Sequence, residues 1–347
     1  MSIITVIGAG VMGSAMSFPA RENGHTVRLV GTMLDRKIID HGKETGFHLT
    51  LKRQLPKGAE FYQLEELDEA LEDVDLIISG VSSFGVEWFA KEIIADLPPE
   101  IPILSITKGM FNLPDGSLLS YPKYYKQKNP NRQFLAIGGP CTSYELADLD
   151  QTHICMCGED MNTLRWAKGL LNTSFYHMSL TTDIEGLECA VAMKNIYALA
   201  VTLAVGLSLG RDNTLHYNSQ AALFGQSVQE MRRLLNLFGY AQDNIVFGAG
   251  DLYVTVYGGR TRKIGTLLGQ GYCFDEAMKE LDGVTLESVV IATRTGEAVT
   301  HLIDTGKAKK EDFPLLLHVY DIITQNTKVD VPWSAFEEER RMENVKS

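Results

Sequence analysis

A glycine pattern near the amino terminus constrains the fold of this chain more than any other feature. The short apolar run Ile3 to Ile7 leads directly into GAGVMG, and a segment of helical character follows it. In this pattern Gly8 permits a tight turn, Gly10 lets the backbone approach a pyrophosphate, and Gly13 lets the helix pack closely on the strand. A lone GxGxxG is weak evidence, because glycine turns recur by chance and flavin and methyl-donor binders share it. Its position between a strand and a helix predicts a nucleotide-binding site.

After this motif, strand-like apolar runs alternate with helical segments up to about residue 180, whereas residues 42–62 show no clear pattern. The expected strands after the first are Thr26–Val30, Leu76–Ser79, Ile103–Ile106, Phe134–Ile137 and Ser174–Leu180, and the expected helices include Leu64–Leu71 and Val86–Leu97. Such alternation is typical of a doubly wound parallel sheet with a Rossmann-like arrangement. From Thr182 onward the pattern is helical throughout. We therefore predict an NAD(P)-binding Rossmann domain at 1–182 and a helical substrate-binding and catalytic domain at 183–347.

The longest apolar stretch, Leu187 to Leu209, contains one basic residue, Lys194, followed by Asn195. A helix that is apolar on nearly every face belongs in a protein interior. Its uninterrupted apolar part, Ile196 to Leu209, is about 14 residues long, which is short of the roughly 20 that a membrane span requires. A buried ammonium must be paired, hydrogen-bonded or shifted in pKa. Lys194 is therefore either a functional group, half of a structural ion pair, or a lysine whose charged end reaches water.

The formal net charge of -12 argues against general binding of nucleic acid or of a membrane surface. An anionic ligand must then be held by a local basic cluster. Such a cluster, Arg260 to Lys263, ends the glycine-rich stretch Phe247 to Gly265, which also contains Asp251. Exposed backbone N–H groups beside arginine suit a phosphate, although a solvated start of a helix would have the same composition.

Three expected strand ends carry unusual residues, and ligands of doubly wound sheets bind beyond the carboxyl ends of the strands. They are VSSFG at Val81 to Gly85, TKG at Thr107 to Gly109, and GGPC at Gly138 to Cys141. Lys108 in the second is a candidate ligand-binding residue, and its alternative is an ordinary surface lysine.

The residue that usually discriminates between the two nicotinamide dinucleotides is not diagnostic here. An acidic side chain after the second strand would bind a ribose hydroxyl, and a basic one would accommodate a 2′-phosphate. Thr32 stands at this position, and Arg36 follows a few residues later. The sequence therefore leaves NAD and NADP open as cofactors.

The five cysteines are an odd number, and none of their spacings matches a zinc pattern, so we expect no metal site. The chain enters its first strand at once, without a basic segment, a long apolar segment or a cleavage site. We expect a cytoplasmic protein with reduced cysteines.

Six motifs occur together and in one order along the chain. They are GAGVMG at Gly8 to Gly13, TKG at Thr107 to Gly109, Gly139-Pro140 with Glu145 to Ala147, Lys194-Asn195, Gly250 to Leu252 with Thr255, and Arg260 in the basic turn. With these motifs the chain resembles the NAD(P)-dependent glycerol-3-phosphate dehydrogenase family over essentially its whole length. The resemblance implies a Rossmann-like domain followed by an all-α domain of the 6-phosphogluconate dehydrogenase kind, in a cytoplasmic homodimer.

The resemblance also implies a reversible hydride transfer between NAD(P)H and dihydroxyacetone phosphate, in glycerophospholipid and carbohydrate metabolism. Lys194 would exchange the proton with the substrate oxygen, Lys108 and Asp251 would line the same site, and Arg260 would hold the phosphate. The implied substrate-binding residues are Lys108, Gly139, Cys141, Asn195, Asp251, Thr255, Arg260 and Thr261. The implied cofactor-binding residues are Gly8, Gly10, Val11, Met12, Gly13, Thr32, Lys108, Ser143, Arg260 and Asp282.

A catalytic role would explain the buried lysine. Lysine has an unperturbed pKa of about 10.4, which makes it a poor acid–base catalyst at neutral pH. Burial and a neighbouring cation both lower that pKa. Lys108 is a candidate for the cation, and Asp251 and Asn195 would orient Lys194.

The chain differs from the family pattern at several positions. Arg260-Thr261 stands in place of Arg-Asn, Thr142 and Ser143 replace an aromatic and a small residue, and Asp282-Gly283 stands where Glu-Gly is usual. Another phosphorylated ketose or polyol would fit the same chemistry. Hydroxyacid or ketopantoate reductases are an alternative, since they also pair an N-terminal fingerprint with a helix lysine. A non-catalytic NAD(P)-sensing protein is a further one, although such a protein would not need the lysines.

Overall fold

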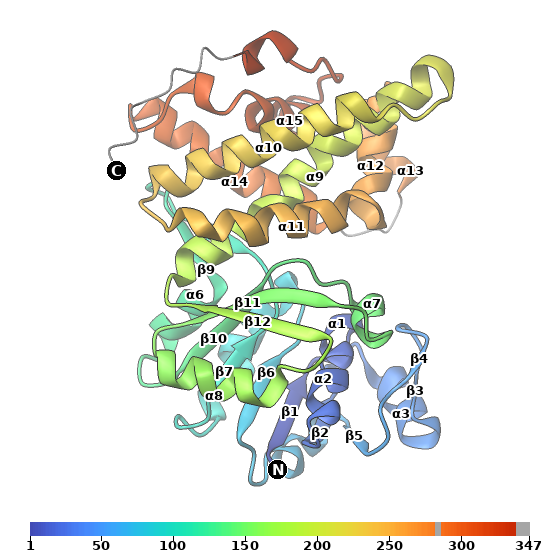
Figure 1. The fold of residues 1–347 in the computed structure, drawn as a ribbon, viewed down its shortest axis with the longest axis vertical. Coiled ribbons are helices and arrows are strands. Elements are labelled where there is room, and N and C mark those ends of the chain that lie inside the picture. The colour runs from blue at the N-terminus through green and yellow to red at the C-terminus, as the bar shows by residue number, and fades with distance from the viewer. Residues whose placement is uncertain (282–285, 338–347) are drawn as a thin grey trace.

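The computed structural model describes residues 1–281 and 286–337. Figure 1 shows a sheet with its flanking helices in the lower half of the molecule and a helical domain in the upper half. The long helix α9 (Ile184–Asp212) begins beside the sheet and rises into the helical domain. The predicted fold class, a Rossmann-like sheet with flanking helices followed along the chain by an all-helical part, is confirmed.

One eight-stranded sheet forms the centre of the first domain, in the spatial order β12-β11-β10-β7-β6-β1-β2-β5. Its strands are β1 (Ile3–Ile7), β2 (Thr26–Val30), β5 (Ala59–Tyr62), β6 (Leu76–Ser79), β7 (Ile103–Ser105), β10 (Phe134–Gly138), β11 (Thr152–Gly158) and β12 (Tyr176–Thr181). The first strand, β1, pairs in parallel with β2 on one side and with β6 on the other. The predicted strands match these elements to within one or two residues.

The sheet is not parallel throughout, which corrects the sequence-based expectation. Strand β11 pairs antiparallel with β10, and β12 then pairs in parallel with β11. The chain between β10 and β11 holds the short helix α7 (Ser143–Ala147) and no long crossover helix, so the next strand returns beside its predecessor. The last two strands therefore run opposite to the other six.

Helices cover both faces of the sheet, and two small hairpins extend it. The helices are α1 (Val11–Ala15), α2 (Ser17–Glu22), α3 (Arg36–Thr45), α4 (Leu67–Ala70), α5 (Val86–Trp88), α6 (Tyr121–Lys128), α7 and α8 (Met161–Leu171), and the hairpins pair β3 (Phe47–His48) with β4 (Arg53–Gln54) and β8 (Met110–Asn112) with β9 (Leu118–Ser120). The predicted helix Val86–Leu97 is α5 continued by a π-helical turn, Phe89–Ile93, and a short 3₁₀ turn. The sequence analysis identified neither hairpin, and it also missed α6, α8 and β11.

The second domain is built around α9. The other helices are α10 (Tyr217–Leu237), α11 (Ile245–Val256), α12 (Gly259–Gly269), α13 (Phe274–Glu280), α14 (Glu287–Asp304) and α15 (Pro314–Gln325). In the described part of the chain, α9 is the one helix long and apolar enough to cross a membrane, but 89% of its apolar window is buried inside the protein. It is a core helix, as its all-round apolar sequence predicts.

Candidate functional site

A cleft of about 790 Å³ lies between the sheet and the helical domain. Its first wall comes from the loops at the carboxyl ends of β1, β6, β7 and β10. Its second wall comes from α9, α11 and the start of α12. Ligands of open α/β sheets bind at this edge, so the fold places the cleft where a site is expected.

Three charged side chains from different elements meet in this cleft. Asp251 of α11 is fully buried and accepts from two lysines, from Lys194 Nζ through Oδ1 at 2.6 Å and from Lys108 Nζ through Oδ2 at 2.5 Å. Lys108 also donates to the carbonyl oxygen of Gly139 at 2.8 Å. Both lysine side chains keep about a sixth of their surface exposed, at 17% for Lys108 and 16% for Lys194. We call these three residues the lysine–aspartate centre.

Close helix packing brings Asp251 to Lys194. A Cβ placed on Gly248 would lie 2.7 Å from the carbonyl oxygen of Ala190, so only glycine allows α11 to approach α9 this closely. Asp251 lies one turn further along α11, facing Lys194. Thr255, another turn on, lines the cleft and donates to the Asp251 carbonyl oxygen at 2.7 Å.

The surroundings lower the pKa of Lys194. Burial is the main cause, since it penalises the charged ammonium. The carboxylate of Asp251 acts in the opposite direction, and the ammonium of Lys108 adds to the lowering. The Glu287 carboxylate, which lines the same cleft, also acts to raise the pKa and does not offset the lowering.

At the other end of the cleft, α12 begins next to Gly258 and Gly259 and presents Arg260 and Thr261. A helix amino terminus has unsatisfied N–H groups and a positive dipole end, so it attracts anions. Arg262 lies outside the cleft lining and donates to the Val256 carbonyl oxygen at 2.8 Å, which fixes this turn. Guanidinium, backbone N–H groups and hydroxyl together form a suitable site for a phosphate.

The glycine pattern has the geometry that its spacing predicts. Gly8 adopts a φ of +110°, and a Cβ there would lie 2.7 Å from the carbonyl carbon of Gly80. At Gly13 a Cβ would lie 2.1 Å from the carbonyl oxygen of Gly8. Gly10 differs, because a Cβ there would meet nothing within 4 Å and would project into the cleft. That open space beside bare backbone fits the pyrophosphate of a dinucleotide.

An adjoining cavity of about 440 Å³ extends the cleft past Gly8 and Thr32. The Asp35 carboxylate turns inward here and accepts from the backbone N–H of Ala9 at 3.2 Å and from the Thr32 hydroxyl at 2.7 Å. Arg36 points away and pairs with Glu65. The loop after β2 therefore presents a hydroxyl to the cavity, with its acid and its arginine already engaged.

The remaining predicted residues take the following positions. The cleft is lined by Val11, Met12, Gly139, Cys141, Ser143 and Asn195. Burial raises the pKa of the Cys141 thiol to about 11, so this group is neutral. The Asn195 amide donates within its own helix to the Ala192 carbonyl oxygen at 3.5 Å, and its predicted role in orienting Lys194 is not visible in a contact. Asp282 lies outside the described residues.

Two residues near the site escaped the sequence analysis. Glu287, at the start of α14, lines the cleft and accepts from the Ser83 hydroxyl at 2.9 Å, which links the two domains across it. His48 is buried and accepts from the Leu51 N–H through Nδ1, so its Nε2 donates to the Ala9 carbonyl oxygen at 2.9 Å and supports the glycine loop. Both act through tertiary contacts, and neither belongs to a local pattern.

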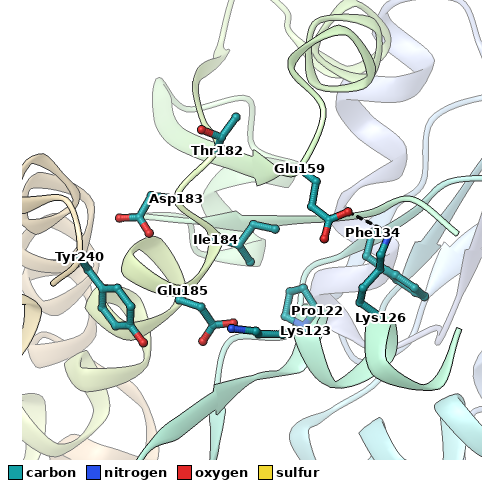
Figure 2. Close-up of a pocket in the computed structure, with 10 residues that line it drawn as sticks. All are labelled: Pro122, Lys123, Lys126, Phe134, Glu159, Thr182, Asp183, Ile184, Glu185 and Tyr240. Atoms are coloured by element: carbon teal, nitrogen blue, oxygen red, sulfur yellow. Dashed lines mark ion pairs between the residues drawn. The ribbon is translucent and has the colours of Figure 1, made fainter. Parts of the chain in front are cut away.

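A second cavity, of about 300 Å³, lies between α6 and the start of α9 (Figure 2). Its acids are engaged within the protein. Glu159 pairs with Lys126 at 2.8 Å, Asp183 accepts from Gly186 N–H at the start of α9, and Glu185 accepts from the Ser120 hydroxyl at 2.5 Å. Of these contacts, the one between Ser120 and Glu185 ties the start of α9 to the first domain.

A glycine loop suited to a dinucleotide, facing a buried lysine–aspartate centre on a second domain, defines the chain as an NAD(P)-dependent dehydrogenase of the two-domain class. Residues 3–164 match the family model for the NAD-dependent glycerol-3-phosphate dehydrogenase N-terminus, and residues 183–333 match the model for its C-terminus. The chain belongs to the NAD-dependent glycerol-3-phosphate dehydrogenase family, as the motif order indicates.

Two known relatives are similar in sequence to this chain over most of its length. The chain is 31% identical to an NADP⁺-dependent glycerol-3-phosphate dehydrogenase of Archaeoglobus fulgidus over 334 residues, which cover 94% of this chain and 97% of that protein. It is 29% identical to a glycerol-3-phosphate dehydrogenase [NAD(P)⁺] of Clostridium botulinum over 293 residues, which cover 83% and 85%.

Solved structures share the fold. A Plasmodium falciparum glycerol-3-phosphate dehydrogenase superposes with a TM-score of 0.82 at 20% identity, covering 99% of this chain and 97% of the other. A ketopantoate reductase from Ralstonia eutropha superposes less well, with a TM-score of 0.56 at 12% identity, covering 93% and 99%. The group considered as an alternative therefore has the same fold at lower similarity.

Proposed function

We propose that this protein catalyses the reversible, NAD(P)H-linked interconversion of dihydroxyacetone phosphate and sn-glycerol 3-phosphate. The observation that carries the proposal is the pairing of Lys194 and Lys108 with the single carboxylate of Asp251 in the cleft. It supports the assignment of Lys194, whose pKa is lowered, as the proton donor, in a cleft lined also by the glycine loop and by Arg260. The family membership supports the same reaction.

When bound, the nicotinamide supplies the hydride to C2 of the ketone or accepts it from the alcohol. In the reduction, Lys194 donates a hydrogen bond to the carbonyl oxygen and gives up its proton as negative charge develops there. Lys108 holds Asp251 from the other side, so the carboxylate is fixed and the Lys194 ammonium has one orientation. In the oxidation, neutral Lys194 takes the proton back.

Arg260 and the start of α12 hold the phosphate of the substrate. The phosphate does not react, and its binding energy fixes the carbonyl carbon near the lysine–aspartate centre. Thr261, where the family has Asn, contributes a hydroxyl instead of an amide. We propose that Gly139, Cys141, Asn195 and Thr255 complete the substrate-binding surface, since all four line the same cleft.

For the cofactor, we propose that Gly8 to Gly13 bind the pyrophosphate while Thr32 faces the adenosine ribose in the adjoining cavity. We assign dinucleotide binding to residues 1–182 and substrate binding to residues 183–347. We further propose that the enzyme works in the cytoplasm as a homodimer, as the family resemblance implies.

The test is a spectrophotometric assay that follows oxidation of NADH and of NADPH. Dihydroxyacetone phosphate is compared with other ketose phosphates and with ketoacids such as ketopantoate. Fast turnover of dihydroxyacetone phosphate, with little or none of its dephosphorylated form, is the expected result. Turnover of a ketoacid instead would favour the reductase alternative and would contradict the proposed phosphate site.

A further inference from the structure

A second buried acid lies close to the lysine–aspartate centre and takes no part in the proposed mechanism. Glu188 belongs to α9, six residues before Lys194, and its side chain is fully buried. Among the described residues neither of its carboxylate oxygens has a well-formed hydrogen bond, and the Gly109 N–H is the one backbone donor close enough to favour the anion. An unpartnered buried carboxylate would be costly as an anion, because an isolated charge loses its hydration.

Each element packed around Glu188 contributes titratable or charged groups. They are Glu185 on α9, Lys108 after β7, Asp251 on α11, Tyr121 on α6 and Cys157 on β11. Lys108, the cation that acts on Glu188, already binds Asp251 and the Gly139 carbonyl oxygen, and Arg294 of α14, beside Tyr121, donates to the Tyr121 hydroxyl and to the Met110 carbonyl oxygen. Glu185 is held by the Ser120 hydroxyl and faces Lys123 across the second cavity (Figure 2). Glu188 therefore lacks a counterion of its own.

The balance of these groups favours the protonated acid. Burial and then the nearby Glu185 carboxylate raise the pKa of Glu188 to about 8. Lys108 and the backbone N–H of Gly109 oppose this rise and do not overcome it. Glu188 is accordingly a neutral carboxylic acid near pH 7.

We propose that Glu188 is a positioning residue for the acid–base step, which adds no negative charge beside the lysine–aspartate centre while it is neutral and strengthens proton binding by Lys194 once it ionises. The inference rests on the proposed reaction, because it assigns Glu188 an effect on the proton donor Lys194. It acts through Lys108, its nearest cation, which shares Asp251 with Lys194.

The sign follows from charge. With Glu188 neutral, Asp251 and the more weakly acting Glu287 are the carboxylates that hold the Lys194 ammonium, and Lys194 releases its proton readily. With Glu188 ionised, a further negative charge stabilises the Lys194 ammonium, so the pKa of Lys194 rises. The wild-type enzyme therefore retains a protonated Lys194 at higher pH than an enzyme that carries a neutral group at this position.

The first experiment compares pH profiles of kcat/KM for wild type and Glu188→Gln. Glutamine has nearly the same shape and stays neutral at every pH. In the direction of ketone reduction we expect similar activity at pH 6.5 and an alkaline limb displaced to lower pH by about half a unit or more. In the direction of alcohol oxidation, the acid limb of the kcat/KM profile of Glu188→Gln should likewise be displaced to lower pH.

Glu230→Gln is the matched control. Glu230 is a fully buried acid on α10, and burial raises its pKa to about 7. Its oxygens accept from the Leu315 and Leu316 N–H groups, so in the described structure it caps α15. This variant should lose stability and leave both limbs in place. Unmoved limbs in Glu188→Gln, or an equal loss of its activity at all pH values, would overturn the inference.

A second measurement needs no substrate and separates this inference from the proposed function. A carboxyl group with a raised folded-state pKa contributes stability that is fully present below its unfolded pKa and is lost as pH rises through the folded value. Urea unfolding should therefore show wild type losing stability relative to Glu188→Gln between about pH 4.5 and 8. A difference that stays constant over that range would refute the neutral acid, whereas failure of wild type to reduce dihydroxyacetone phosphate would refute the proposed reaction.

Discussion

The glycine loop and the lysine–aspartate centre form opposite walls of one cleft, but they are built in different ways. The loop is one continuous segment, and its shape depends on the absence of side chains. Gly10 is open to the cleft, and a Cβ on Gly13 would lie 2.1 Å from the Gly8 carbonyl oxygen. The centre depends on charged side chains, and Asp251 meets partners 57 and 143 residues away in the sequence. The loop therefore depends on close steric fit of the backbone, whereas the centre depends on electrostatic interactions between side chains.

The difference predicts which changes each wall tolerates. A methyl group added to a glycine of the loop creates a steric overlap, which should lower either the stability of the fold or the affinity for the cofactor. A charge removed from the centre acts on proton transfer and leaves the cofactor surface unchanged. Substitutions in the two walls should therefore separate into different kinetic and thermodynamic effects.

The largest effect is expected for Lys194→Met. Loss of the proton donor should lower kcat by about 10³-fold, since general acid–base groups contribute roughly 10² to 10⁴. Asp251 keeps Lys108 as its partner, so the fold and NADH binding should persist. Steady-state kinetics and NADH fluorescence titration measure the two quantities, with the exposed Lys263→Met as control. Parallel loss of cofactor binding and folding would make Lys194 a structural residue.

Arg260→Ala should act mainly on binding of the substrate phosphate. Loss of charge-assisted hydrogen bonds worth about 2 to 3 kcal/mol should raise the KM for dihydroxyacetone phosphate roughly 30- to 150-fold. The weak activity on dihydroxyacetone should hardly change. Lys263→Ala is the matched control, because Lys263 is exposed and lies outside the cleft lining. Equal effects of Arg260→Ala on both substrates would remove this residue from the phosphate site.

Alanine substitutions at Gly10 and Gly13 test the glycine loop, because the first glycine faces the cleft and the second packs against backbone. Gly13→Ala should cost about 2 kcal/mol of unfolding free energy, because its Cβ overlaps the backbone of Gly8. Gly10→Ala should change that free energy by less than about 0.5 kcal/mol, since it meets no protein atom, while weakening cofactor binding roughly tenfold. Chemical denaturation and cofactor titration measure both. Unaltered cofactor affinity in Gly10→Ala would place the pyrophosphate elsewhere.

The smallest effect is expected for Thr261→Asn, which introduces the residue usual in the family. The turn is braced by Arg262, which donates to the Val256 carbonyl oxygen at 2.8 Å, so it should keep its shape. One neutral hydrogen bond is worth about 1 kcal/mol, and the KM should change by less than about fivefold. A tenfold or greater gain would show that this turn is adapted to a different phosphorylated substrate.

Local patterns explain how much of the fold the sequence predicts. Strands β1 (IITVI), β2 (TVRLV) and β6 (LIIS) are short, mostly apolar and rich in β-branched residues, and the predicted bounds coincide with the observed ones. Edge strand β5 (AEFY) is half-polar, and β11 contains Cys, Met and an exposed His153, so neither has a clear periodicity. The reversal of β11 depends on the length of one connection, which no local pattern encodes.

The candidate site also contains residues that a local pattern predicts and residues that only the folded structure reveals. Gly8 to Gly13 and Lys194 are visible as a motif and as a charge in an apolar run. The family resemblance, not residue spacing, linked Lys194 with Lys108 and Asp251, and their catalytic roles stay predictions. Glu188 lies in the same apolar run as Lys194 but attracted no attention, because its lack of a partner is evident only once the surrounding elements are placed.

The reversed strands also decide where the molecule can be divided. Because β12 runs opposite to β10, α9 starts at the far edge of the sheet and spans about 43 Å. Its first turns pack on the sheet so closely that a Cβ on Gly138 would lie 2.8 Å from Val191, and Leu187 and Val191 share a core cluster with Ala136, Cys155 and Cys157. A chain cut at residue 182 would strip that cluster of its cover. The two halves are therefore not interchangeable modules, and exchange of domains between relatives should succeed only when the first half brings its own α9.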